Sequence, residues 1–312
     1  MKHTTLYVVL ALAAGLAAGL AAGCRESPSP EEADGPEYAP KRMRILSLAP
    51  NVTEILFALG LGSRIVGRSN YCDFPEEAKT IPAVGDTIHL NLEKIVSLEP
   101  TVAFVVTKRA DVVKTLQSLG IRTVALESDT MNELLKAIET IGHETGRPAP
   151  AQTLIDDIQD DLDTVRRRVE GRPRPKVLFA FPMAVGSSNM MVAGRGTFVD
   201  ELLSVAGGEN AFPEAADWPT ITPQRVIELA PEVVIVNAVG EDAAPDRVEA
   251  IGRAWMNWAS IPAVANSRVY ILQDEFLTIP GPGVGMAADR LSRVIHRPGP
   301  GETDFAEERD RP

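Results

Sequence analysis

The feature that most constrains the fold of this chain is an internal repeat. Residues 91–102 (NLEKIVSLEPTV) match residues 222–233 (TPQRVIELAPEV), and residues 53–56 (TEIL) similarly match residues 200–203 (DELL). Each longer copy has the pattern of a short helix that is broken by a proline and followed by an apolar strand. A chain that repeats one such unit is expected to build two similar lobes with a cleft between them.

Around the repeats, short apolar runs alternate with helical segments in both halves of the chain. Strands are expected at residues 44–49, 65–68, 101–106, 121–126, 177–181, 233–237 and 268–272. Helices are expected at residues 54–59, 91–98, 111–119, 132–142, 199–205, 223–229, 255–259 and 285–295. Pro50 is expected to end the first strand, and Asn51 or Thr53 is a candidate cap for the first helix. This alternation predicts parallel α/β sheets.

Between the two halves lies one long polar segment, residues 148–171, that carries an apolar stripe: Leu154, Ile158, Leu162, Val165 and Val169. Spacings of three and four residues place this stripe on one face of a helix. The predicted fold class is therefore α/β. Two Rossmann-like lobes with parallel sheets, residues 43–147 and 173–297, are joined by one long backbone helix, residues 148–172. A ligand cleft is expected between the lobes.

The first residues of the chain predict export. Lys2 precedes an uncharged run over residues 6–23 that is rich in Ala, Gly and Leu and ends directly before Cys24. Small residues before a cysteine resemble a bacterial lipobox, although Ala21 stands where a leucine is usual. The prediction is a lipoprotein signal peptide over residues 1–23, a lipidated Cys24 and an extracytoplasmic, membrane-anchored protein. An uncleaved membrane anchor and a cleaved secretory peptide are the alternatives.

The flanking segments have the composition of tethers. Residues 24–42 are rich in Pro and Glu and cannot bury apolar area, so a linker is expected there. Residues 298–312 predict a disordered tail. Cys72 is the only cysteine besides Cys24, so a lipidated chain has no partner for an internal disulfide.

Charge and motif content exclude several classes of function. The formal net charge is -12, which argues against nucleic acid as a partner. His89, His143 and His296 lie far apart, and the sequence contains no GxSxG, Walker or CxxC motif. Residues 194–197 (GRGT) precede a predicted helix and could hold an anion at its N-terminus. No catalytic residue, metal site or cofactor is predicted, so the chain is not expected to be an enzyme.

Five motifs resemble the helical-backbone (class III) periplasmic binding proteins that serve ABC importers. They are residues 45–60 (ILSLAPNVTEILFALG), 69–75 (SNYCDFP), 91–95 (NLEKI), 206–212 (AGGENAF) and 217–219 (DWP). The likeness runs from about Arg44 to Pro298 and is greatest to the cobalamin-binding branch. The resemblance implies a monomeric carrier that captures cobalamin or a related corrinoid and delivers it to the permease subunits of an importer.

Site residues follow from the resemblance by position. Tyr71, Trp218 and Asp274 match positions that contact the ligand, and rigid aromatic faces suit a broad planar ligand. Thr87 stands where the cobalamin branch carries a tryptophan that contacts the corrin. Glu93 matches an acidic residue that docks onto arginines of the permease.

The second docking position departs from the family pattern. The internal repeat places Gln224 opposite Glu93, where the family usually has a second glutamate, and Glu228 lies one turn later. Residues 279–283 (IPGPG) resemble the family motif Arg-Pro-Gly-Pro-Arg, but this chain lacks both arginines of that motif. Ala206 replaces a cysteine of some cobalamin binders.

Three other functions stay open on sequence alone. A ferric-siderophore or haem carrier has the same fold, but the lost arginines argue against anionic iron complexes, and haem would need an axial Tyr71 or His89. A lipoprotein hydrolase would act in the same cleft. A pure interaction module on the membrane surface would bind no small molecule.

Overall fold

The computed structural model describes residues 43–86, 88–106, 110–182 and 189–297. All of these lie in one compact unit, Tyr38–Pro312. The predicted signal peptide, Cys24, the linker, Thr87 and the C-terminal tail lie outside the described residues.

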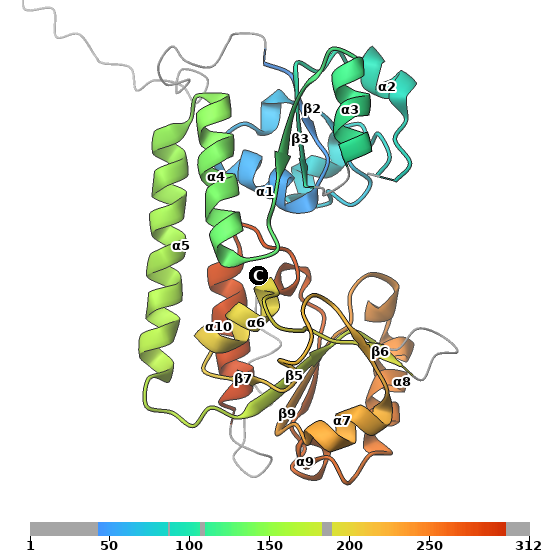
Figure 1. Cartoon of the computed structure of the whole chain (residues 1–312), viewed down its shortest axis with the longest axis vertical. Coiled ribbons are helices and arrows are strands. Elements are labelled where there is room, and N and C mark those ends of the chain that lie inside the picture. Colours follow the sequence, from blue (N-terminus) through green and yellow to red (C-terminus); the bar gives the residue numbers. More distant parts are fainter. Residues whose placement is uncertain (1–42, 87, 107–109, 183–188, 298–312) are drawn as a thin grey trace, which may run out of the picture. The chain divides into compact units, whose positions relative to one another are not determined.

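The N-terminal lobe is a parallel four-stranded sheet with helices between its strands (Figure 1). Its strands are β1 (Ile45–Ser47), β2 (Ile65–Arg68), β3 (Val102–Val106) and β4 (Arg122–Leu126), in the order β2-β1-β3-β4. Its helices are α1 (Pro50–Ala58), α2 (Leu92–Ser97), α3 (Ala110–Ser118) and α4 (Met131–Thr145), and short 3-10 helices cover Gly62–Arg64 and Glu76–Thr80. β1 and β3 are central and, apart from the polar Ser47 and the half-buried Val106, consist of buried apolar residues, as expected for a sheet that is covered on both faces.

The C-terminal lobe repeats this topology. β5 (Lys176–Ala180), β7 (Glu209–Asn210), β9 (Val233–Asn237) and β10 (Val269–Leu272) form a parallel sheet in the order β10-β9-β5-β7. In each lobe the first strand is flanked by the second and the third, and the fourth lies outside the third. The two-lobe α/β fold predicted from the sequence is confirmed.

The helices of the C-terminal lobe are α6 (Phe198–Val205), α7 (Pro223–Leu229), α8 (Pro245–Met256), α9 (Pro262–Ala265) and α10 (Val284–Ile295). Short 3-10 helices cover Gly240–Ala243 and Glu275–Leu277. β6 (Met190–Met191) and β8 (Thr220–Ile221) add a small antiparallel pair. β6, β7 and β8 have only two residues each. Such short strands produce no apolar run in the sequence, so they were not predicted.

The sequence repeat extends to the backbone geometry of the two lobes. The side chains of Asn91 and Thr222 cap α2 and α7, and each accepts a hydrogen bond from the backbone N–H three residues on. After the helices, Glu99 and Ala230 adopt left-handed φ values of 45° and 47°, and a proline follows each of them. The two segments therefore share a cap, a helix and a turn.

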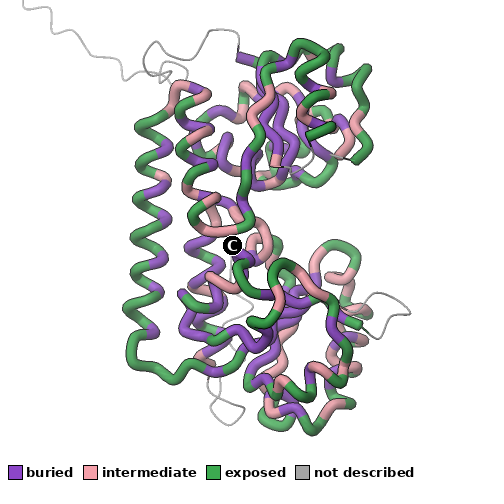
Figure 2. Tube along the Cα trace, in the orientation of Figure 1, coloured by how far each residue is buried: buried purple, intermediate pink, exposed green. Residues whose placement is uncertain are grey.

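One long helix, α5 (Pro148–Val169), runs along both lobes. It has 22 residues, a length of about 33 Å, and it packs against α4 and against α10 (Figure 1). Its buried residues are Ala151, Ile155, Ile158, Leu162, Val165 and Val169, whereas Leu154 is only half-buried. All of these buried residues except Val169 belong to one apolar cluster that includes residues of both sheets. Figure 2 shows how buried and exposed positions alternate along α5.

Two local predictions are wrong. Helix α1 begins at Pro50 with Ala49 as its N-cap, so Asn51 and Thr53 lie inside the helix and are buried. Proline at the first helical position needs no hydrogen-bond partner and has a helical φ, which starts the helix earlier than a capping side chain would.

The predicted helix at residues 255–259 is also wrong. Helix α8 ends at Met256, and its buried face carries Ile251 and Trp255. Trp255 and Trp258 stack edge-on at 4.8 Å, so the chain beyond the helix end stays packed by an apolar contact without being helical. Within the described residues, no helix combines the length and the apolar character that crossing a membrane requires.

Candidate functional site

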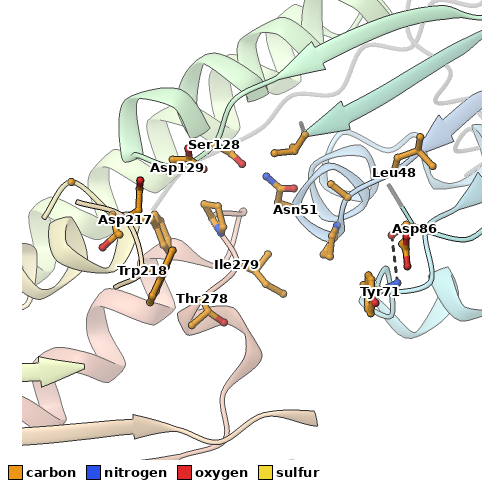
Figure 3. Close-up of a pocket in the computed structure, with 18 residues that line it drawn as sticks. Leu48, Asn51, Tyr71, Asp86, Ser128, Asp129, Asp217, Trp218, Thr278 and Ile279 are labelled. Carbon is orange, nitrogen blue, oxygen red and sulfur yellow. Dashed lines mark hydrogen bonds between the residues drawn. The ribbon is translucent and has the colours of Figure 1, made fainter. Parts of the chain in front are cut away.

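A pocket of about 600 Å³ lies where segments of both lobes meet (Figure 3). This volume is within the range of about 300–1,000 Å³ that is usual for small-molecule sites. Its lining consists of Leu48, Ala49, Pro50, Asn51, Ser69, Tyr71, Asp86, Val106, Ser128, Asp129, Gly196, Thr197, Phe198, Asp217, Trp218, Thr278, Ile279 and Pro280.

The N-terminal lobe contributes residues that directly follow its parallel strands. Leu48 follows β1, Ser69 follows β2, Val106 ends β3, and Ser128 comes two residues after β4. Because the carboxyl ends of parallel strands meet at one edge of a sheet, these segments come together there. The pocket therefore lies where open α/β sheets usually bind ligands.

The C-terminal lobe contributes the equivalent helix start and two loops. Thr197 and Phe198 begin α6, just as Ala49 and Pro50 begin α1 in the other lobe. Residues 278–280 form a segment after β10 that passes close to α1. A Cβ atom on Gly281, which follows this segment, would lie 2.8 Å from Oε2 of Glu54.

Two predicted ligand contacts, Tyr71 and Trp218, both line this pocket, one from each lobe. Trp218 is half-buried, and its ring lies 5.3 Å from that of Phe181, which itself stands edge-on to Phe179 at 6.2 Å. These contacts fix the plane of the indole. Tyr71 is 66% exposed and is free to cover a ligand.

Asn51 supplies an unsatisfied polar group. The residue is 4% exposed, and its Nδ2 atom has no hydrogen-bond partner within the described part of the chain. Figure 3 shows the amide directed away from α1. A buried donor without a partner costs about 1–3 kcal/mol, so a ligand acceptor is the expected partner.

Three carboxylates also line the pocket: Asp86, Asp129 and Asp217. The backbone N–H groups of His89 and Ile88 donate to Oδ1 of Asp86, both at 2.7 Å. These bonds lower the pKa of Asp86 below its usual value. Asp86 is therefore negatively charged at neutral pH.

The turn at residues 194–197 does not present an open anion site. The N–H of Gly196 donates to Oδ2 of Asp200 at 2.9 Å, and the hydroxyl of Thr197 accepts from the N–H of Asp200 at 3.1 Å. The start of α6 is thus satisfied by a carboxylate of its own first turn. The geometry therefore gives no support to the anion-binding role that the sequence left open for this turn.

Asp274 is placed outside the pocket lining. Its Oδ2 atom lies 3.0 Å from Nε of Arg290, and its carbonyl oxygen accepts from Nδ2 of Asn237. These contacts give Asp274 a role in holding β10 to α10 and β9, and the geometry gives its predicted ligand contact no support.

The predicted docking residues lie on the exposed faces of α2 and α7. Glu93 and Gln224 are both exposed, at equivalent positions of the repeat. Glu228 is exposed too, but it forms an ion pair with Arg225 at 2.8 Å. Arg225 also pairs with Glu214.

Burial changes the acidity of Glu54, which lies beneath the segment that follows β10. Desolvation, together with the nearby charge of Glu275, raises its pKa to about 7. The carboxyl is thus placed where its charged form is unfavourable.

The described residues contain no side-chain cluster suited to binding a metal ion. No group of three His, Cys, Asp or Glu side chains among them could hold a metal ion. Cys72 is fully buried, with Sγ 3.1 Å from Oγ of Ser69. A pocket with apolar walls and a few polar groups is the usual form of a small-molecule site.

Asn51, Asp86, Asp129 and Asp217 were not predicted as site residues. Ligands usually bind beyond the carboxyl ends of parallel strands. This rule could have identified Asn51, Asp86 and Asp129, since each lies in a connection between a predicted strand and the helix that follows it. Asp217 precedes Trp218 in the DWP motif, of which only the tryptophan was predicted to contact the ligand.

Known proteins are similar to this chain in sequence and in fold. The profile of a family described as periplasmic binding protein matches residues 45–276. The uncharacterized ABC transporter substrate-binding lipoprotein YvrC of Bacillus subtilis (strain 168) is 27% identical over 258 residues, which cover 81% of this chain and 80% of that protein. The vitamin B12-binding protein of Vibrio cholerae serotype O1 (strain M66-2) is 26% identical over 256 residues, covering 81% and 88% of the two chains.

Among solved structures, the periplasmic heme-binding protein RhuT from Roseiflexus sp. RS-1 in apo form is similar with a TM-score of 0.71. It is 27% identical, and the match covers 81% of this chain and 97% of that one.

Proposed function

The chain belongs to the periplasmic binding protein family, and we propose that it captures cobalamin or a related corrinoid and delivers it to an ABC importer. Family membership makes it an ABC transporter substrate-binding protein and implies an extracytoplasmic location. Relatives are named for vitamin B12 or for haem, so the family leaves the ligand open.

The observation that carries the proposal is the pair of aromatic residues in one pocket. Tyr71 and Trp218 come from opposite lobes and line the same space. Two aromatic faces bury a broad, flat ligand at a low entropy cost, because few rotatable bonds are frozen. A corrin ring is such a ligand, and its capture requires no chemical step.

A haem or ferric-siderophore carrier is the second candidate. It is favoured by the similarity in fold to a haem-binding protein and by the phenol of Tyr71, which could ligate iron at the pocket. Among the described lining residues, no Arg or Lys is available to pair with acidic groups of such a ligand. This makes haem and anionic iron chelates the weaker proposal.

A calorimetric titration tests the ligand. The full chain, purified in detergent, is titrated with cyanocobalamin, with haem and with a ferric siderophore. Tight one-to-one binding of cyanocobalamin is expected, and Trp218→Ala and Tyr71→Ala should each weaken it by about tenfold or more, since buried aromatic contacts dominate such sites. Met256→Ala, which removes an exposed apolar side chain outside the pocket, serves as the control. Binding of haem without binding of cyanocobalamin would favour the second candidate.

Docking onto the permease is proposed for α2 and α7. Glu93 and Gln224 occupy equivalent exposed positions, and each helix also exposes an apolar residue three positions on, Val96 at 52% and Ile227 at 41%. Exposed apolar residues beside a charge are typical of a protein interface. Glu228 is already paired with Arg225, so Glu93 carries the stronger case.

Anchoring by a lipid on Cys24 is proposed from the lipobox-like sequence alone. Cys24→Ser is expected to move the protein from the membrane fraction to the soluble fraction and to abolish labelling by a palmitate analogue. Retention of Cys24→Ser in the membrane fraction would instead indicate an uncleaved apolar anchor.

A further inference from the structure

One wall of the pocket is formed by two segments, one from each lobe. Residues 50–51 at the start of α1 and residues 278–280 after β10 both line it (Figure 3). Glu54 lies one turn further along α1, and a Cβ atom on Gly281 would lie 2.8 Å from its Oε2 atom. The two segments can approach so closely because Gly281 has no side chain. The Glu54 carboxyl therefore lies between α1 and the segment of residues 278–283.

The surroundings of this carboxyl disfavour its charge. Burial is the larger cause and the negative charge of Glu275 the smaller, and together they raise the pKa of Glu54 to about 7. Glu54 is the only titratable residue of α1, and residues 278–283 carry none. Glu275 lies on the short 3-10 helix that leads into this segment. Lys79 acts on Glu275 from the N-terminal lobe and is already paired with Glu76.

Two positions of the 278–283 segment would differ in the proton on Glu54. Against α1, the segment keeps the carboxyl buried and its pKa near 7, whereas a displaced segment admits water and returns the pKa towards 4.5. Between these two values the seated state holds a proton that the displaced state releases, so rising pH favours displacement. Below this window both states are protonated, and above it both are ionised, so the balance levels off.

We propose that Glu54 is a positioning residue of the pocket: uncharged, it lets residues 278–283 sit against α1, and ionised, it loosens this segment and weakens ligand binding. The inference rests on the proposed function, because it concerns the affinity of that same pocket. A ligand that contacts both segments needs them seated, so its binding is coupled to uptake of a proton. Only a local shift of the segment is involved.

The pH dependence of affinity tests the proposal. The full chain in detergent is titrated by calorimetry with cyanocobalamin at pH 5 and at pH 8. Affinity should be about tenfold or more higher at pH 5. At pH 6, comparison of buffers with different enthalpies of ionisation should reveal uptake of up to one proton on binding. Equal affinity at the two pH values would overturn the inference.

Matched variants assign this dependence to Glu54. Glu54→Gln, neutral and of the same shape, should bind equally well at both pH values and take up no proton. Glu139→Gln, an exposed carboxylate on α4, should keep the dependence. His89, whose Nδ1 lies 3.8 Å from Oδ1 of the pocket residue Asp86, can also accept a proton, so His89→Gln belongs in the series and should keep it too. A dependence that survives in Glu54→Gln, or that disappears in His89→Gln, contradicts the proposal.

The close approach at Gly281 is tested by a double-mutant cycle. Gly281→Ala places a methyl group against Oε2 of Glu54, so at pH 5 it should weaken cyanocobalamin binding about threefold or more. In a Glu54→Ala background the methyl group has room, and the same change should have little effect. Equal losses in both backgrounds would show that the contact does not set affinity and would overturn the inference.

Hydrogen exchange without ligand separates this inference from the proposed function. After correction for intrinsic rates, backbone amides of residues 279–284 should exchange about fivefold faster at pH 8 than at pH 5, and Glu54→Gln should abolish the difference. If this result is obtained but cyanocobalamin does not bind, the corrinoid proposal alone is wrong. Equal exchange at both pH values overturns the role of Glu54, whichever ligand binds.

Discussion

At the scale of single residues, Asn51 combines a structural cost with a proposed use. Its side chain is buried at the start of α1, yet Nδ2 has no partner in the described part of the chain. Proteins rarely leave such a donor unsatisfied without a reason. Ligand binding would supply the missing acceptor.

Asn51→Ala is expected to weaken ligand binding while changing the stability of the fold very little. Removing an unsatisfied donor offsets the small cavity that is left, so the free energy of unfolding should change by less than about 1 kcal/mol. Cyanocobalamin affinity should fall about tenfold, since the ligand loses a buried hydrogen bond. Chemical denaturation and calorimetry measure the two effects. A large loss of stability would mean that Asn51 serves the fold of α1 instead.

Glu54 predicts a pH dependence of stability. Its pKa is raised to about 7 by burial and by Glu275, whereas the unfolded chain releases this proton near the usual value of 4.5. Between these two values the folded state holds more protons than the unfolded state, so the free energy of unfolding falls as pH rises. Above pH 7 the folded state bears the full free-energy cost of burying the charged Glu54 carboxylate.

Glu54→Gln should therefore stabilise the protein at pH 8, by about 1–3 kcal/mol, and give little gain at pH 4. Urea denaturation at the two pH values measures this difference. Glu139→Gln, an exposed carboxylate on α4, is the control and should show no such dependence. An equal change in the free energy of unfolding by Glu54→Gln at both pH values would contradict the raised pKa of Glu54.

At the scale of elements, the repeat gives two helices with the same cap, the same buried position and the same exposed face. Ile95 of α2 and Val226 of α7 are both fully buried, and the next residue in each helix is exposed. At the proposed docking position the repeat has diverged in charge, since Glu93 in one helix corresponds to Gln224 in the other. The docking surface proposed for α2 and α7 is therefore asymmetric in charge.

Reversal of charge on α2 tests the docking surface. Glu93→Arg should abolish importer-dependent uptake while leaving ligand affinity unchanged, because the residue is exposed and outside the pocket. Gln224→Glu is expected to preserve or increase uptake. Glu139→Arg controls for the change in net charge. Normal uptake with Glu93→Arg would exclude this residue from docking.

At the scale of the whole described unit, α5 connects the lobes through one continuous apolar cluster. The N–H of Met131, at the start of α4, also donates to Oε2 of Glu201 in α6 at 2.6 Å. Packing along a long helix resists bending because core side chains are close-packed. Only small lobe motions are therefore expected on ligand binding.

Spin labels on the two lobes can measure this motion. Cysteines at Gln117 in α3 and Glu249 in α8 occupy exposed positions, Cys72 is buried, and Cys24 is replaced by Ser. The mean distance between the labels should change by less than about 3 Å when ligand is added. A change of about 10 Å or more would instead reveal hinge closure.

The sequence by itself determined the two-lobe α/β architecture and the correspondence of Gln224 to Glu93 in the repeat. These follow from periodicity and repetition, which are local properties of the chain. Tyr71 and Trp218 were identified from motifs that resemble a family. The tertiary structure decided the rest, since it alone brings the start of α1, the turns after β2 and β4 and the DWP segment together.

Two groups show why this assembly could not be predicted from sequence. Asn51 resembled a helix cap, and its missing partner is visible only when its whole surroundings are known. Glu54 resembled any surface carboxylate of a helix, and its raised pKa arises from burial beneath a segment more than two hundred residues away in the chain. Both effects depend on long-range burial, which local sequence patterns do not encode.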